Sequence, residues 1–122
     1  MTPREFERLV RAAARSLPAQ YRRRLDNVAI IVRARPSRAE RAAAKIGPGQ
    51  TLLGLYTGTP LAERGSGYSF ALPDRIFLYR EPLLATAHTR RGLVAQIEAT
   101  LRHEIAHHFG ISDERLDELG LD

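Results

Sequence analysis

Residues 89–110, TRRGLVAQIEATLRHEIAHHFG, decide the fold of the chain, because they predict its longest helix, from about Thr89 to Phe109. One apolar stripe runs along this stretch at four-residue spacing: Leu93, Ile97, Leu101 and Ile105. That spacing is typical of a helix that buries one face and exposes the other. Gly110 ends the helix, because glycine readily adopts the left-handed conformation that follows a helix end.

The last two turns of this helix carry the motif His103-Glu104-Ile105-Ala106-His107. Residues four apart lie one above the other on a helix, so the two imidazoles can converge on one divalent ion. Glu104 is turned about 100° away from His103. It is therefore a poor ligand in that plane but a good neighbour for a water on the metal, as zinc hydrolases require. The alternative is that both histidines are ordinary polar residues of the helix.

A third ligand has to come from beyond the helix, because the helix axis carries the next turn past the ion. A reversal at Gly110 would return the chain, and Asp113, six residues after His107, is the predicted third zinc ligand. Alternatively, Asp113 serves only in the first turn of a short helix over 112–119, where the helix dipole favours an acid. The fallback ligands are Glu114, Asp117 and Glu118.

The rest of the chain predicts further helices and a few strands. Helices are expected from Pro3 to about Leu17, with a short turn over 19–25, and over 36–45; strands are expected over 28–33, 52–57 and 76–79. Thr2-x-x-Glu5 and Ser37-x-x-Glu40 are capping boxes for two of these helices. Gly47-Pro48-Gly49 breaks the second of them, Glu81-Pro82 ends the third strand, and residues 63–68 predict an exposed loop. This mixture predicts a small α+β fold in a single domain, 1–122.

Composition and charge narrow the class of protein. The chain has 122 residues and no cysteine, which excludes disulfides and thiolate zinc sites. Its longest purely apolar run, residues 28–32, is far below the roughly 20 residues that cross a bilayer. A capped helix at the N-terminus differs from a signal peptide, so we expect a cytoplasmic protein. Residues 1–45 carry a net charge of +8, but they lack the basic and aromatic stripe of single-strand binders, so nucleic-acid binding is not favoured.

The sequence resembles the small bacterial zincin-like metallopeptidases, or minimal metalloproteases. The matching blocks are Leu52–Tyr56, Pro60-Leu61, Glu63–Gly65, Leu72–Asp74, Ile76, Leu78–Arg80, and His103–Leu116 apart from Ala106, where the family often has glycine. The resemblance implies a zincin-like α+β domain with a short mixed sheet packed on the C-terminal helix and additional N-terminal helices. It also implies one zinc ion held by His103 and His107, with Asp113 as the expected third ligand. Glu104 would be the general base in the hydrolysis of a peptide or protein substrate.

Several roles remain open within that mechanism. Tyr68, Tyr79 and Arg115 are candidate donors to the developing oxyanion. His108 is expected to pack against or orient a neighbour. The alternative function is a metal-binding pseudoenzyme or regulatory interaction module without peptidase turnover. Glu104 favours the enzyme, because a structural zinc has no use for a water-activating carboxylate and is normally closed by a fourth ligand.

Overall fold

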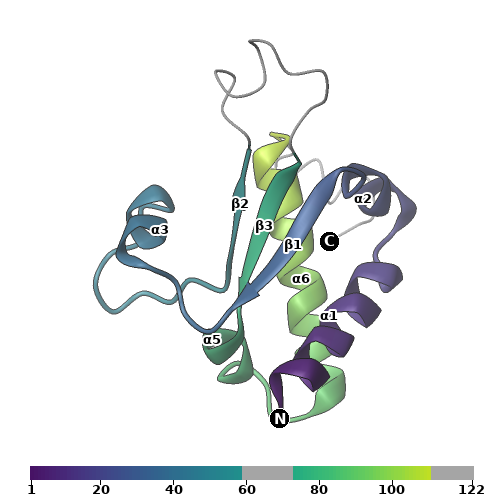
Figure 1. Ribbon diagram of the computed structural model, residues 1–122, viewed down its shortest axis with the longest axis horizontal. Coiled ribbons are helices and arrows are strands. Elements are labelled where there is room, and N and C mark those ends of the chain that lie inside the picture. The colour runs from purple at the N-terminus through teal and green to yellow at the C-terminus, as the bar shows by residue number, and fades with distance from the viewer. Residues whose placement is uncertain (59–72, 111–122) are drawn as a thin grey trace.

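The computed structural model of the protein describes residues 1–58 and 73–110. Within these ranges a three-stranded sheet packs against helices, which confirms the predicted α+β fold (Figure 1). The elements are α1 (Pro3–Ser16), α2 (Ala19–Arg24), β1 (Val28–Arg33), α3 (Arg38–Ala43), β2 (Gly54–Thr57), β3 (Asp74–Tyr79), α5 (Arg80–Leu84) and α6 (Arg90–His108). The loop expected over 63–68 and the helix expected over 112–119 lie outside the described residues.

The sheet is mixed, with strand order β1-β3-β2. β1 runs parallel to the central strand β3, with Ile30 opposite Ile76, and β2 runs antiparallel to β3, with Tyr56 opposite the same residue. Successive residues of a strand point to opposite faces. Ile76 and Leu78 accordingly belong to the main core, and Phe77 and Tyr79 belong to a second, smaller apolar cluster.

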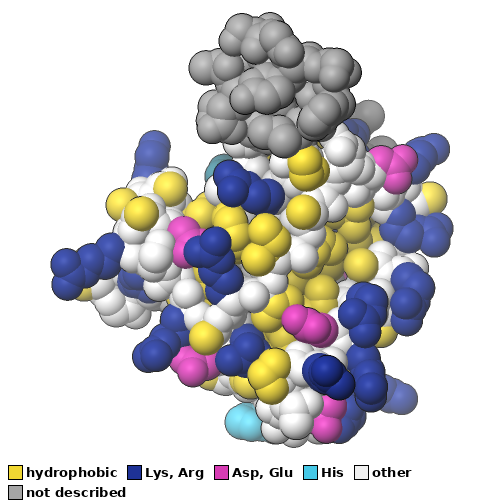
Figure 2. Space-filling model, in the orientation of Figure 1, with side chains coloured by type: hydrophobic (Ala, Val, Ile, Leu, Met, Phe, Trp, Pro, Cys, Tyr) yellow, Lys and Arg dark blue, Asp and Glu magenta, His cyan; other side chains and the backbone are white. Residues whose placement is uncertain are grey.

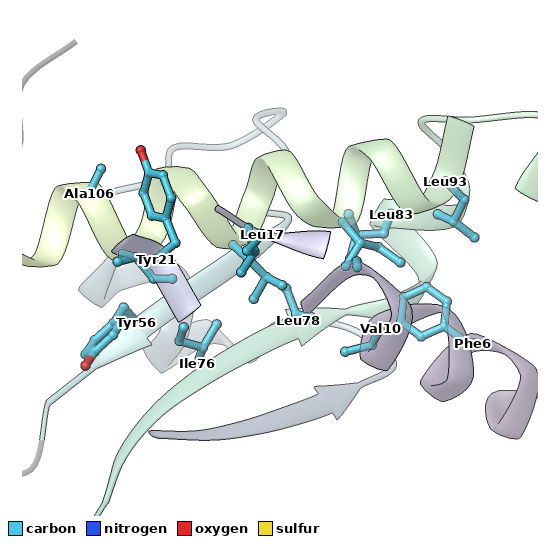
Figure 3. Packing of buried hydrophobic residues seen from close by; sticks show 14 residues of the cluster. Phe6, Val10, Leu17, Tyr21, Tyr56, Ile76, Leu78, Leu83, Leu93 and Ala106 are labelled. Carbon is cyan, nitrogen blue, oxygen red and sulfur yellow. The ribbon is translucent and has the colours of Figure 1, made fainter. Parts of the chain in front are cut away.

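The main core lies between the sheet and the long helix α6, which passes behind the sheet beside α1 in Figure 1. The predicted stripe of α6 is fully buried: Leu93, Ile97, Leu101 and Ile105 are each at most 2% exposed. Figure 3 shows this layer, with Tyr56 at the end of α6 that carries Ala106 and with Phe6 and Leu93 at the other end. In the described ranges, no helix combines the length and apolar character needed to cross a membrane.

Both predicted capping boxes are present. The Thr2 hydroxyl accepts a hydrogen bond from the N–H of Glu5 (3.1 Å), and the Ser37 hydroxyl accepts one from the N–H of Glu40 (3.0 Å). Thr89 caps α6 in a similar way, through the N–H of Gly92 (3.0 Å). The first residues of α1, α3 and α6 are therefore fixed by hydrogen bonds to the side chain of the N-cap residue.

Several boundaries differ from the sequence prediction, and β3 begins at Asp74, two residues earlier than expected. α3 ends at Ala43, before Gly47-Pro48-Gly49, because Lys45 adopts a left-handed conformation (φ 58°) and closes the helix with hydrogen bonds from Lys45 N–H to Ala42 O and from Ile46 N–H to Arg41 O. β2 starts at Gly54, two residues later than expected. The third strand passes directly into the unpredicted helix α5, in which Pro82 lies in the first turn, where a missing N–H costs nothing.

α3 is attached to the sheet through Glu40. One carboxylate oxygen of Glu40 accepts the N–H of Ser37 (2.9 Å), and the other accepts the hydroxyl of Tyr79 from β3. Arg33 of β1 lies 3.5 Å from the same carboxylate. Burial alone would raise the pKa of Glu40, but the hydrogen bonds from Tyr79 and Ser37 and the charge of Arg33 outweigh it, and the pKa lies below its ordinary value. The ionised carboxylate therefore stabilises the position of α3.

Tyr79→Phe is expected to lower the free energy of unfolding by about 1.5 kcal/mol at pH 7, because it removes a hydrogen bond to a mostly buried carboxylate. Glu40 has a lowered pKa in the folded protein, so its contribution is present above its unfolded pKa and is lost as the pH falls through the folded value. The difference between wild type and variant should therefore shrink below about pH 4. Urea unfolding at pH 7 and pH 3 measures it, and an equal difference at both pH values would contradict this account.

Candidate metal centre

His103 and His107 lie on the last two turns of α6, and both side chains are exposed. Because the helix is continuous to His108, the two imidazoles stand one turn apart on one face, with about 5–6 Å between their Cβ atoms. Within residues 1–58 and 73–110, no three His, Cys, Asp or Glu side chains come together as a metal site. Asp113, the predicted third ligand, and the fallback ligands Glu114, Asp117 and Glu118 lie outside the described residues.

The helix ends next to Gly110, as the sequence predicted, whereas the chain reversal expected after Gly110 lies outside the described residues. α6 ends at His108 and is capped by Phe109, whose N–H donates to Ile105 O (3.0 Å), and the N–H of Gly110 donates to His107 O (3.2 Å). Gly110 has φ 72°, the left-handed conformation that ends a helix. The helix therefore ends directly beyond the histidine pair.

Glu104 lies between the two histidines in sequence but faces the sheet. The backbone N–H of Tyr56 in β2 donates to Oε1 of Glu104 (3.0 Å). Burial raises the pKa of Glu104, and the Tyr56 N–H together with the nearby His107 and His103 acts in the opposite direction, with burial dominant. Oε2 has no hydrogen-bond partner among the described residues. Glu104 is thus a partly buried carboxylate with one oxygen fixed and one available.

Tyr56 also joins β2 to the end of α6 through its side chain. Its ring stacks on His108, with ring centroids 3.8 Å apart, and its hydroxyl donates to Oδ2 of Asp74 (2.8 Å). Nε2 of His108 lies 3.9 Å from the same carboxylate oxygen, and the guanidinium of Arg24 lies 4.7 Å from the centroid of the Phe109 ring. His108 therefore packs against a neighbour, as predicted, and the stack holds the end of α6 against β2.

A cavity of about 490 Å³ opens beside these residues. Its described lining comes from three places: Ala43–Ile46 at the end of α3, Leu52 and Gly54–Tyr56 along β2, and Glu104, His107 and His108 of α6. The cavity is large enough to hold part of a ligand, since ligand sites have volumes of about 300–1,000 Å³. Glu104 and His107 thus line a hollow rather than a flat surface.

The profile described as zincin-like metallopeptidase matches residues 25–121 of the chain. The chain belongs to the zincin-like metallopeptidase family. The zincin-like family in general implies a zinc-dependent centre, and the matched range contains the helix with the histidine pair and the cavity beside it.

A solved structure is similar in fold to this chain. It is a conserved hypothetical protein from Thermo thermophilus, which is 23% identical, with a TM-score of 0.54 over 99% of this chain and 100% of that one. No curated protein matches the chain. The likeness to the solved structure concerns the fold alone.

The described residues of the zincin-like site fit a zinc ion. The two exposed imidazoles supply nitrogen donors at the spacing that lets both reach one ion, and nitrogen donors suit zinc. Glu104 is committed to Tyr56 through one oxygen, so it is not free to act as a bidentate ligand. The described residues thus offer two imidazoles that could hold the ion and, beside them, one carboxylate that is held by the sheet.

One predicted candidate for oxyanion stabilisation is wrong. Tyr79 is fully buried in the smaller apolar cluster, and its hydroxyl is committed to Glu40 of α3. Strand alternation explains the error, because Tyr79 points to the sheet face that α3 covers, whereas Ile76 and Leu78 point to the face that α6 covers. Tyr68 and Arg115, the other two candidates, lie outside the described residues.

The sequence did not single out Tyr56 as a residue of the site. It contributes through its backbone N–H, which every residue except proline carries, so residue type gives no signal. The strand pattern of residues 52–57 placed Tyr56 in a strand but did not say which edge of the sheet that strand forms. A predicted strand order would have been needed to find the contact with Glu104.

Proposed function

We propose that the protein is a zinc-dependent peptidase that hydrolyses peptide bonds, with Glu104 as general base and with His103, His107 and Asp113 as zinc ligands. The placement of Glu104 supports this most strongly. Its carboxylate is partly buried, is held through Oε1 by the N–H of Tyr56, and lines the same cavity as His107. A raised pKa from burial is typical of a carboxylate used in proton transfer.

Zinc held by His103, His107 and Asp113 would supply Lewis-acid polarisation of the scissile carbonyl and a bound water with a pKa of about 7. Both proton transfers of the reaction are assigned to the carboxylate of Glu104. Oε1 of Glu104 is fixed by Tyr56, so Oε2 accepts the proton of the water that attacks the carbonyl carbon. The same carboxyl group then passes that proton to the leaving amine nitrogen as the C–N bond breaks. The stack of Tyr56 on His108 maintains the position of α6 relative to β2 while this happens.

In the part of the chain that the structure describes, β2 forms an edge of the sheet, and this edge is the proposed binding site of an extended substrate. Tyr79 N–H donates to Leu53 O (3.0 Å), so by the alternation of antiparallel pairs Leu55 also faces β3 with its hydrogen-bonding groups. Gly54 and Tyr56 then direct theirs away from β3. The N–H of Tyr56 is used by Glu104, and among the described residues the N–H and C=O of Gly54 are the groups that would pair with a peptide.

Zinc binding tests the ligand assignment. The wild-type protein is expected to bind one equivalent of zinc, and His103→Ala and His107→Ala are expected to bind clearly less under the same conditions, as measured by metal analysis after dialysis against limiting zinc. His88→Ala is the matched control, because His88 is exposed and precedes α6. Equal zinc content in all four proteins would contradict the assignment.

Turnover separates the enzyme from the alternative. We expect the zinc-loaded protein to cleave members of a mixed peptide library, detected by mass spectrometry. One equivalent of zinc without cleavage of any peptide would instead support a metal-binding interaction module.

A further inference from the structure

The cavity beside Glu104 has two unlike sides. The α6 side presents the polar residues Glu104, His107 and His108. The opposite side is made by the end of α3 and by β2, and most of its side chains are apolar: Ala43, Ala44, Ile46, Leu52 and Leu55. Figure 1 shows α3 standing apart from the helices behind the sheet, next to β2. We call these five residues the α3 wall.

Hydrogen bonds and packing hold the α3 wall in a fixed position against the sheet. At one end, Glu40 of α3 accepts the hydroxyl of Tyr79 from the central strand. At the other end, Nη2 of Arg41 donates to the carbonyls of Gly47 and Gln50, each at 2.9 Å, and ties the helix to the segment that leads into β2. Ala44, Ile46 and Leu55 pack in part against the buried cluster of Leu52, Phe77 and Tyr79. Figure 2 shows hydrophobic side chains between α3 and the sheet on the visible face.

Lys45 gives this side of the cavity its charge. It is the only lysine of the chain, and it lines the cavity from the left-handed position just after α3. Glycine is the usual residue at that position, and a residue with a Cβ is held there at a cost of about 1 kcal/mol. Lys45 is exposed and makes no ion pair with any described residue. A positive charge at this place disfavours a basic side chain in the cavity.

An extended peptide bound along β2 would contact both the α6 side and the α3 side of the cavity. Successive side chains of an extended chain point to opposite faces, so a peptide paired with β2 sends one side chain toward α6 and the next toward α3. The side chain directed to α3 leaves water and meets apolar residues next to a positive charge.

We propose that the α3 wall is a specificity subsite for an uncharged apolar side chain of the peptide substrate, such as leucine, methionine or phenylalanine, and that Lys45 excludes lysine and arginine from it. This inference rests on the proposed function for the identity of the ligand as a peptide. It adds the substrate class, which depends on α3 and on the turn at Lys45 rather than on the histidine motif.

The test compares two glutamates placed one residue apart on α3. Ala43→Glu puts a carboxylate on the α3 wall, whereas Ala42→Glu puts the same charge on an exposed position of the same helix that does not line the cavity. Both are read out on zinc-loaded protein, as kcat/KM with wild-type Glu104 and as binding of fluorescent peptides with Glu104→Gln. Ala43→Glu is expected to weaken cleavage and binding of apolar peptides at least about tenfold, and Ala42→Glu to stay within about twofold of its parent.

Two further variants test size and charge separately. Ala43→Leu keeps the wall apolar but narrows the cavity, so the preference should move toward smaller apolar side chains. Lys45→Glu should raise the relative acceptance of lysine and arginine peptides at least about tenfold. Equal effects of Ala43→Glu and Ala42→Glu, a wild-type preference for charged side chains, or no change with Lys45→Glu would overturn the proposal.

The binding readout distinguishes failure of this inference from failure of the proposed function. Selective binding of apolar peptides that Ala43→Glu weakens, without any cleavage by the wild type, supports the subsite and refutes the peptidase. Cleavage that shows no dependence on Ala43 or Lys45 supports the peptidase and refutes the subsite. Absence of both binding and cleavage refutes both.

Discussion

Glu104→Gln is expected to lower kcat for peptide hydrolysis by about 10²–10⁴-fold while leaving zinc content unchanged. The glutamine carbonyl still accepts the N–H of Tyr56, so the contact between α6 and β2 is kept. The amide lacks the basic oxygen that takes the proton from water. His103 and His107 are untouched, so loss of activity with one equivalent of zinc retained assigns the defect to proton transfer.

The free energy of unfolding provides a second, independent measurement of the effect of Glu104→Gln. Burial raises the pKa of Glu104, so the folded protein holds this proton more tightly than the unfolded chain does. The resulting stabilisation is present below the unfolded pKa and is lost as the pH rises through the folded value. The ionised carboxylate therefore costs stability at pH 7, and the metal-free Glu104→Gln variant should be at least as stable there as the metal-free wild type in urea unfolding.

Glu98→Gln is the matched control for Glu104→Gln. Glu98 lies on the same helix, accepts the hydroxyl of Ser16 (3.0 Å) and faces Arg102 one turn later (3.8 Å), away from the cavity lining. This variant should keep kcat within about twofold, because a partly exposed ion pair contributes about 0–1 kcal/mol. Equal losses of activity in both variants, or full activity of Glu104→Gln, would remove Glu104 from the role of general base.

The helices could be predicted from the sequence because their signals are local. The four-residue stripe of α6 and the capping boxes of α1 and α3 involve residues only a few positions apart, and each is found as predicted. The end of α3 could not be predicted in the same way. A lysine does not indicate a left-handed conformation, so nothing in the sequence marks Lys45 as the residue that closes the helix. The Gly-Pro pair that begins two residues later is a stronger helix breaker, and it sets the predicted end of the helix.

In the candidate site, too, the features that depend on nearby residues could be predicted, and those that depend on distant contacts could not. The spacing of His103 and His107 and the turn of Glu104 away from them follow from helix geometry, so they could be predicted. The Tyr56 N–H and the α3 wall depend on β2 forming an edge of the sheet, and strand order is set by contacts far apart in sequence. The wrong assignment of Tyr79 has the same origin, because the sequence alternation does not say which face of β3 meets α6.

The approach of β2 to α6 depends on the absence of a side chain at Gly54. A Cβ built there would lie 2.8 Å from Cγ2 of Thr100 and 3.0 Å from the backbone oxygen of Phe77. Thr100 is buried, and its hydroxyl donates to Gln96 O (2.8 Å), so its methyl group is held in place. Only glycine lets β2 lie this close to the helix, two residues before the N–H that holds Glu104.

Gly54→Ala is therefore expected to lower the free energy of unfolding by about 3 kcal/mol, since a well-packed region has to move to accept the added carbon. Moving β2 away from α6 also lengthens the Tyr56 to Glu104 hydrogen bond, so kcat should fall in the protein that remains folded. Gly58→Ala is the matched control, because a Cβ there would lie 3.4 Å from Cε1 of His108, the nearest atom among the described residues. Urea unfolding and kcat under native conditions measure the two effects.

A second substitution at Thr100 tests the cause of the Gly54→Ala defect. Thr100→Ser removes Cγ2 and keeps the hydroxyl that donates to Gln96 O, so it should restore part of the stability of Gly54→Ala in a double-mutant cycle. Recovery should be incomplete, because the contact with the backbone oxygen of Phe77 remains at 3.0 Å. Strictly additive effects of the two substitutions would show that the closeness of β2 to α6 at Thr100 is not what requires glycine at position 54.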